Sequence, residues 1–151
     1  MRDMRPEDAR AMLRQGRVGV LALARGGDAY GLPVYYAFDG RHLYFHTHPG
    51  HKSDYIGATR EACFTLVAAR STDEWASIMV FGVLERVDGT PSHLAAMHAL
   101  MAVPLPPEWG VSEAGEPRRG GEGAATYRLT PTRISGRFSQ REVEPSALEV
   151  S

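Results

Sequence analysis

The strongest constraint on the fold is a tight turn between two runs rich in aromatic and β-branched residues. Residues 29–38 form the first run, residues 42–47 form the second, and Asp39-Gly40 stands between them. An Asp-Gly pair between such runs is a strong hairpin signal, because its backbone twist matches that of paired strands. We therefore predict two antiparallel strands here, with residues 32–36 beside residues 43–46.

Outside this hairpin, the sequence predicts further short strands and only a few helices. Helical spacing of apolar residues is confined to short segments, so the chain lacks the regular strand and helix alternation of a doubly wound parallel sheet. We therefore predict a mainly β fold, a small antiparallel barrel with helices outside it. The expected strands are residues 18–24, 29–38, 42–47, 62–69, 76–87 and 125–135, and the expected helices are residues 5–15, 51–59 and 90–102.

The length of 151 residues fits a single domain, residues 1–151. Nine of the 20 residues from 104 to 123 are Gly or Pro, which predicts a loop, and residues 140–151 are expected to be a frayed tail. The 17 basic and 18 acidic residues leave a net charge of −1, which excludes a broad basic surface for nucleic acid. The sequence has no secretion signal and no run of 18 apolar residues, so we expect a cytoplasmic protein that does not enter a membrane.

The segment from residue 43 to residue 55 is the best candidate for chemistry, because it is expected to run from a strand through a tight turn into a helix. Sixteen of the 17 basic residues are Arg, and the only Lys is Lys52, in this segment. The free N–H groups of a helix N-terminus, the charge of Lys52, a donor on His51 and the Thr47 hydroxyl together suit a phosphate monoester. An ordinary solvated loop is the alternative, and spacing alone does not separate the two. No glycine-rich nucleotide loop is present, so the standard ATP and dinucleotide folds are not expected.

The sequence offers little support for a metal site. Cys63 is the only cysteine, which excludes an internal disulfide and a zinc site of several cysteines, and its apolar neighbours predict a small buried hydrophobe. His46, His48 and His51 are a candidate zinc or copper set. A turn intervenes before His51 and no carboxylate has the right spacing, so we do not favour it. A haem held by one of these histidines is a further alternative.

Three more residues each have two possible structural interpretations. Ser77 lies in a run that alternates like a half-buried strand, so it either points inward toward a ligand or lies on the wet face of an edge strand. Gly82 marks either a bulge or a close backbone approach. Trp109, in the loop rich in Gly and Pro, either covers a flat ligand or anchors the loop.

Three blocks of sequence occur in a specific order and spacing: Gly31-Leu-Pro-Val-Tyr-Tyr36 before the Asp-Gly turn, Leu43-Tyr-Phe-His46 followed by Gly50-His-Lys52, and Trp75-Ala-Ser-Ile-Met-Val-Phe-Gly82. Together these blocks resemble the pyridoxamine 5′-phosphate oxidase-like, FMN-binding split-barrel superfamily. Within it, the chain is most similar to the nitroimidazole-resistance (Nim) branch. The resemblance covers residues 5–87 and returns in residues 127–138.

The resemblance implies a six-stranded antiparallel split β-barrel of the Greek-key type. It also implies a homodimer with two FMN sites at the subunit interface. The strand that contains Pro33, Val34, Tyr35 and Tyr36 is expected to lie along the flavin, largely through backbone groups. Tyr35, Tyr36 and Phe45 are expected to help form the pocket for the flavin ring, and a plain role in the barrel core is the alternative for each.

The same resemblance implies roles for the polar residues. His46 stands where the Nim branch has a histidine beside the cofactor, and we expect it to donate a hydrogen bond or a proton there. Lys52 matches a lysine that binds the FMN phosphate in the oxidases, and His51 replaces a neighbouring arginine. Thr47 is expected to assist at the phosphate. Ser77 falls where the oxidases place a polar Gln near the flavin, and Trp109 is a candidate cover for the ring.

Two departures point away from oxidation of vitamin B6. The C-terminal substrate motif of the oxidases is absent, and Gly31 stands where they have an Arg. We expect an FMN-dependent oxidoreductase in which NADH or NADPH gives electrons and a small nitroaromatic or quinone-like acceptor takes them. Deazaflavin and haem, which some relatives bind, are less favoured alternatives to FMN. The rival function is a non-enzymatic protein that stores, senses or sequesters a flavin or haem.

Overall fold

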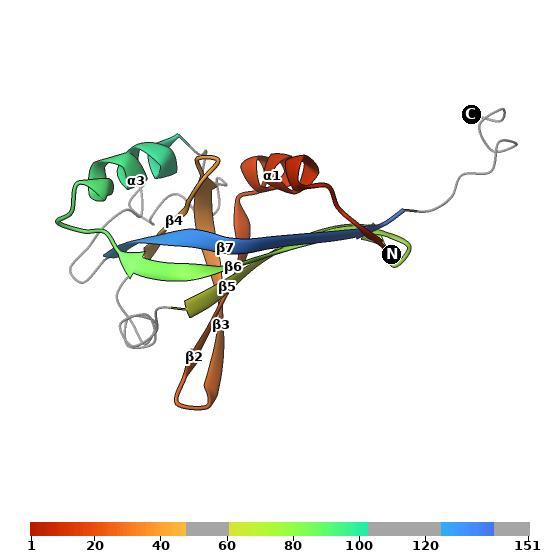
Figure 1. Ribbon diagram of the computed structural model, residues 1–151, viewed down its shortest axis with the longest axis horizontal. Helices are drawn as coiled ribbons and strands as arrows, with labels where there is room; N and C mark the ends of the chain where they lie inside the picture. The colour runs from red at the N-terminus through yellow and green to blue at the C-terminus, as the bar shows by residue number, and fades with distance from the viewer. Residues whose placement is uncertain (48–60, 103–124, 141–151) are drawn as a thin grey trace, which may run out of the picture.

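Six strands of this protein close into an antiparallel ring. The structure, a computed structural model, describes residues 1–47, 61–102 and 125–140. The ring has the order β7-β4-β3-β2-β5-β6, and β6 pairs with β7 to close it. The predicted six-stranded split barrel with peripheral helices is therefore confirmed (Figure 1). The elements are β1 (Arg2–Asp3), α1 (Pro6–Gln15), β2 (Val18–Arg25), β3 (Asp28–Phe38), β4 (Leu43–Thr47), β5 (Glu61–Ser71), β6 (Glu74–Arg86), α3 (Ser92–Met101) and β7 (Ala125–Ser139).

Two tight turns set the register of the first three barrel strands. Gly26-Gly27 joins β2 to β3, and its φ values of 53° and 89° are the positive values that a two-residue type I′ turn requires. At the next turn, the Asp39 carboxylate accepts backbone hydrogen bonds from Arg41 at 2.8 Å and from His42 at 2.7 Å. Bonds of this kind stabilise a turn locally. The predicted Asp-Gly hairpin is therefore confirmed, with a return strand one residue shorter than expected.

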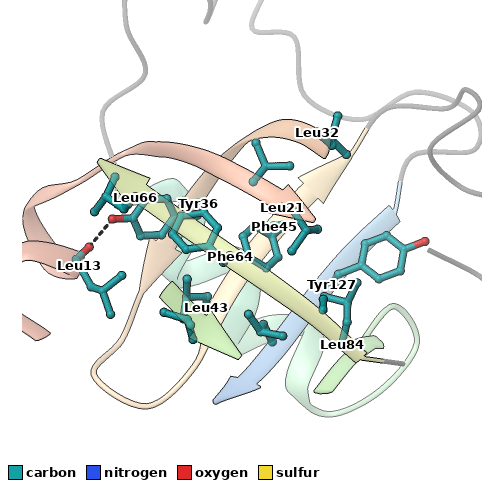
Figure 2. Close-up of a cluster of buried hydrophobic side chains, with 14 of the residues drawn as sticks. Leu13, Leu21, Leu32, Tyr36, Leu43, Phe45, Phe64, Leu66, Leu84 and Tyr127 are labelled. Atoms are coloured by element: carbon teal, nitrogen blue, oxygen red, sulfur yellow. Dashed lines mark hydrogen bonds between the residues drawn. The ribbon is translucent and has the colours of Figure 1, made fainter. Parts of the chain in front are cut away.

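Large apolar side chains fill the barrel interior, as Figure 2 shows. The ring of Phe64 on β5 lies 4.7 Å from that of Tyr36 and 5.7 Å from that of Phe45, measured between centroids. Helix α1 adds Ala9 and Leu13 to the same cluster. The buried Tyr36 hydroxyl donates a hydrogen bond of 2.6 Å to the backbone carbonyl of Leu13, drawn dashed in Figure 2. This bond attaches the helix to β3 inside the core.

A second, smaller core lies outside the barrel, under α3. Tyr44 of β4 is buried there with Val87 and with Ala96 of α3. Tyr44 points out of the barrel because its two strand neighbours point into it. Helix α3 therefore covers the outer face of β4 and β7. Figure 1 shows α1 and α3 on the same side of the strands, with the β2–β3 hairpin projecting away from them.

Gly82 marks a close approach between β6 and β7. A Cβ atom at this position would overlap the backbone carbonyl of Thr130 on β7. The pairing of the two strands also shifts between Phe81 and Gly82, which leaves Thr132 as an extra residue on β7. The prediction of a bulge or close approach at Gly82 is therefore confirmed.

Cys63 lies on the outer face of the barrel and is partly exposed. Its neighbours Ala62, Phe64 and Leu66 point into the core, so the alternation of β5 turns Cys63 outward. The expectation of a buried cysteine is therefore wrong. The apolar run 62–67 is a strand with only one face in the core.

Some predictions fall outside the described residues: the helix at 51–59, the loop at 104–123 and all but the first residue of the tail at 140–151. Within the described part, β1 is a short strand that the sequence did not predict, and it pairs with the end of β7. Among the residues described, no helix has both the length and the apolar character needed to cross a membrane.

Candidate functional site

The candidate site begins where β3 and β4 separate. The two strands pair only where Tyr36, Ala37 and Phe38 face Phe45, Tyr44 and Leu43. The expected pairing of residues 32–36 with 43–46 is therefore wrong except at Tyr36. On its other edge, β4 pairs along its whole length with β7. On the side away from β2, residues 31–34 of β3 pair with no strand in the described part of the chain. An edge of this kind presents backbone N–H and C=O groups that can pair with another molecule.

The side chains of β3 divide between the core and the outer face. Pro33 is exposed on the outer face and Tyr35 is half-buried there, whereas Val34 and Tyr36 fill the core. A proline has no backbone N–H, which suits a strand whose edge is open. Tyr36 and Phe45 have no exposed surface, so their side chains belong to the barrel core, the alternative that the sequence left open. Any contact they make with a ligand is through the backbone.

His46 lies on the outer face of β4, at the same opening. Its cross-strand partner on β7 is Thr126. One step beyond the last β3–β4 pair, Tyr35 stands opposite His46, so the three residues form a row across the outer face. The His46 Nδ1 atom lies 3.0 Å from Thr126 Oγ1, a hydrogen bond that orients the imidazole.

Thr126 is held in turn by Asp88, which follows β6. The Asp88 carboxylate accepts a hydrogen bond of 2.8 Å from the Thr126 backbone N–H and one of 3.0 Å from Arg86 Nε. His93 Nδ1 of α3 lies 3.6 Å from the same carboxylate. Partial burial acts to raise the pKa of Asp88, but these hydrogen bonds and the neighbouring charges outweigh it and hold that pKa below its ordinary value. Asp88 is therefore a fixed anion beside the β4–β7 pair.

Sequence reasoning did not find Thr126, Asp88 or Met97, whose Sδ atom accepts a hydrogen bond of 3.8 Å from the Thr126 hydroxyl. The only local signal is the alternation of β7, which puts Thr126 on the face opposite Tyr127. That signal does not say which strand or helix covers the face. The partner of Thr126 depends on the β4–β7 register, and residues 80 positions apart in the chain set it.

Ser77 lies on the outer face too, but on the far side of β2 and β5. It is partly exposed on β6 and pairs with Val67 of β5. Because β6 has a neighbour on each side, Ser77 is on an outer face but not on an edge strand. Three strand spacings separate β6 from β3, which is roughly 14 Å along the sheet. A single chain therefore does not bring Ser77 next to Tyr35 or His46.

An uncharged stripe crosses the outer face of the barrel from β3 to β7. It is defined here as Pro33, Val20, Thr65, Met79 and Ser135. Its members are cross-strand neighbours on β3, β2, β5, β6 and β7. Val20 is 43% exposed and Met79 is 41% exposed, and Val67 in the next row is 61% exposed. The outer face therefore leaves three large apolar side chains partly in contact with solvent.

The structure does not bring the remaining predicted site residues together with His46 and Tyr35. Thr47 is the last residue of β4, and His51, Lys52 and Trp109 lie outside the described residues. The phosphate site therefore stays a prediction. His48 and His51 of the candidate metal set are outside the described residues too, and within that part no group of three His, Cys, Asp or Glu is placed to hold a metal ion.

A closed ring of six antiparallel strands, two of which separate a few residues beyond their shared turn, defines the split-barrel class of proteins. The chain belongs to the pyridoxamine 5′-phosphate oxidase family, whose model matches residues 5–138. This match covers most of the chain and confirms the family resemblance seen in the sequence.

Three similar proteins illustrate the range of the fold. An uncharacterized protein, RA0666, from Rhizobium meliloti (strain 1021) is 26% identical over 110 residues, which are 72% of this chain and 73% of that protein. A FAD-binding protein from Mesorhizobium loti has a TM-score of 0.75 at 25% identity and covers 93% of this chain and 97% of its own. A heme binding protein from Mycobacterium smegmatis has a TM-score of 0.72 at 19% identity, covering 93% of this chain and 58% of its own.

Proposed function

We propose that this chain binds FMN at the opening between β3 and β4 and that it is an oxidoreductase. The proposed activity moves electrons from NADH or NADPH to a small acceptor of the nitroaromatic or quinone type. A bound flavin supplies that redox chemistry, and the protein binds and orients it. Membership of the family and the FAD-binding protein at 25% identity support a flavin as the ligand.

The observation that carries the proposal is the end of the β3–β4 pairing at Tyr36 and Phe45, next to His46. An isoalloxazine ring is flat and has polar atoms along one side, so a strand edge with backbone donors and acceptors suits it. Tyr35 and His46 lie next to each other on the outer face at that edge. Lys52, the only lysine of the chain, follows His46 by six residues in the sequence. We assign Lys52, with Thr47 and His51, to the phosphate.

A second copy of the chain completes the proposed site. Ser77 lies roughly 14 Å from the row of Tyr35 and His46 within one chain, a distance of three strand spacings. In a two-fold dimer the same surface of both copies is in contact, so Ser77 of the partner subunit can reach the flavin at this opening. The uncharged stripe, with Val20 and Met79 partly exposed, supplies the apolar surface for that contact.

Gly31 bears on which acceptor the site can take. It is exposed on β3 at the open edge, and a Cβ atom there would approach only Val20, at 3.6 Å. The position therefore offers space and no positive charge. A flat neutral acceptor fits this environment better than a phosphorylated vitamin B6, whose phosphate needs an Arg or Lys partner. The side chain that we expect to serve such an acceptor is His46, as a donor of a hydrogen bond or a proton.

The proposal is tested by the absorption spectrum of the purified protein and by titration with FMN and with FAD. We expect a flavin spectrum, or uptake of added FMN to one per chain. Under anaerobic conditions, NADH or NADPH should bleach the bound flavin, and a nitroaromatic or quinone should restore its colour. A colourless protein that takes up neither flavin would overturn the flavin site. Flavin that binds but is bleached by neither nicotinamide would overturn the enzymatic part.

Haem binding is the second candidate, and it rests on the half-buried His46 at the same opening and on the heme binding protein of similar fold. An imidazole is the commonest axial ligand of haem iron in proteins. An intense Soret band in the purified protein, together with no uptake of FMN, would favour this candidate over the flavin.

A further inference from the structure

A buried hydroxyl stands behind His46. Thr126 is fully buried, and apart from tyrosines it is the only buried polar side chain in the described part of the chain. Burying a hydroxyl costs free energy unless it is hydrogen-bonded, and a valine has nearly the same shape without that cost. The position lies between His46 on β4 and Met97 on α3. We therefore infer that the hydroxyl is present to form a hydrogen bond with one of these two side chains.

The hydrogen atoms of this group can be assigned from its two contacts. A threonine hydroxyl has one hydrogen to donate and lone pairs that accept. Its hydrogen bond to Met97 Sδ, at 3.8 Å, has the hydroxyl as donor, because a thioether sulfur can only accept. The hydroxyl then has only lone pairs left for His46 Nδ1, at 3.0 Å. When the hydroxyl donates to the sulfur, the ring nitrogen supplies the hydrogen of the bond between His46 and Thr126, which gives both groups a partner.

We propose that Thr126 and Met97 are positioning residues that keep the proton of His46 on Nδ1. This makes Nε2 the atom of the ring that takes up and releases a proton. The inference deepens the proposed function, since it names the atom through which His46 would serve a ligand at the β3–β4 opening. Which nitrogen of a histidine carries the proton is set by the hydrogen bond that the other nitrogen makes.

The proton balance of this arrangement is simple. When the imidazolium gives a proton to an acceptor, the Nε2–H bond breaks, its electron pair stays on Nε2, and the ring becomes neutral with its hydrogen on Nδ1. Water returns a proton to Nε2 afterwards. The bond from Nδ1 to Thr126 is kept in both states, so the ring does not have to flip between them.

The charged groups around Thr126 and His46 do not change the assignment of the proton to His46 Nδ1. Asp88 is the nearest carboxylate, and it accepts from the Thr126 backbone N–H and from Arg86, not from the hydroxyl. From α3, His93 lies beside that same carboxylate. From β7, Arg128 is paired with Glu85 and donates to a hydroxyl of α3. None of these bonds uses the Thr126 hydroxyl, so its hydrogen is left for Met97.

The test is nitrogen-15 NMR of the histidine rings, recorded on the full-length protein as purified, above the pH at which His46 becomes neutral. We expect Nδ1 of His46 in the protonated, pyrrole-type range and Nε2 in the unprotonated, pyridine-type range. Thr126→Ser keeps the hydroxyl and should retain this pattern. Thr126→Val removes the acceptor, and Nε2 should then gain pyrrole character at the expense of Nδ1.

Met97→Leu is the sharpest variant, because a merely structural role for Met97 would not exchange the two signals. With no sulfur to receive it, the Thr126 hydrogen is free to turn to His46 Nδ1. We therefore expect the pyrrole-type signal to move from Nδ1 to Nε2 while Thr126 stays in place. An Nε2-protonated ring in the unchanged protein, or a ring whose tautomer is the same in Met97→Leu, would overturn the inference.

Failure of this inference can be told apart from failure of the proposed function. The NMR signals report the tautomer whether or not a flavin is bound. A protein that binds no flavin but shows the Nδ1-protonated ring refutes the function and supports the assignment. A protein that binds FMN with the opposite tautomer supports the function and refutes the assignment.

Discussion

The substitution Met79→Glu tests whether the outer face of the barrel is an interface between two copies of the chain. Met79 lies in the uncharged stripe and is 41% exposed in one chain. Burying a whole Met side chain contributes about 1.5–3 kcal/mol, so burying the part that remains contributes about 1 kcal/mol per copy. A two-fold interface counts each change twice, giving about 2 kcal/mol per dimer. Leaving two buried carboxylates without partners adds at least about 1–3 kcal/mol each.

The sum is at least about 4 kcal/mol, so Met79→Glu should weaken the dimer by at least about 700-fold in Kd, since each 1.4 kcal/mol is about tenfold. Stability of the single chain should change by less than about 0.5 kcal/mol, because in one chain the new charge faces water. Sedimentation equilibrium over a concentration series measures the first quantity, and urea unfolding at low concentration measures the second. Met101→Glu is the matched control, because Met101 is 62% exposed on α3, outside the stripe. Equal dimer Kd values for the two variants would refute the reasoning.

Four further predictions follow from single contacts. Tyr36→Phe leaves a buried carbonyl of α1 without its donor and should lower the free energy of unfolding by about 1–3 kcal/mol in urea titrations. Gly82→Ala places a Cβ against the backbone of β7 and should lower the unfolding midpoint clearly, whereas Gly31→Ala, with open space around it, should leave it nearly unchanged. Lys52→Ala should weaken FMN binding by about 1.5–3 kcal/mol in equilibrium titrations, with a smaller loss for Lys52→Arg, and equal affinity would remove Lys52 from the phosphate site. The lowered pKa of Asp88 contributes stability above the ordinary Asp pKa of about 3.9 that is lost as pH falls through the folded value, so Asp88→Asn should show a smaller acid-induced drop in urea midpoint.

The elements of the barrel could be predicted from the sequence because their signals are local. The Asp39-Gly40 turn and the alternation on either side of it specify a hairpin without reference to the rest of the chain. Gly82 was recognisable as a special position for the same reason, since a glycine in a strand weakens it unless the backbone needs the space. Cys63 was misplaced because an apolar run does not say whether one face or both faces of a strand are buried.

The candidate site was harder to predict because it depends on contacts between distant parts of the chain. No local pattern shows where the pairing of β3 with β4 ends, or the register in which β4 pairs with β7 on its other edge. Thr126 can be recognised as a site residue only from the β4–β7 register, which places it beside His46. Tyr36 and Phe45 were assigned to the ligand pocket, but their side chains lie in the core. The sequence could not separate the two, because a large aromatic residue in a strand is found both in ligand pockets and in cores. Only the inward direction set by the barrel assigns them to the core.

The most direct test of the central claim is the stoichiometry of flavin measured together with the oligomeric state. Analytical ultracentrifugation with detection at a flavin wavelength and a protein wavelength follows both in one sample. We expect a dimer with two FMN molecules, and release of FMN when dilution or Met79→Glu separates the two chains. FMN that stays bound with unchanged affinity to a single chain would contradict the claim that two copies build the site.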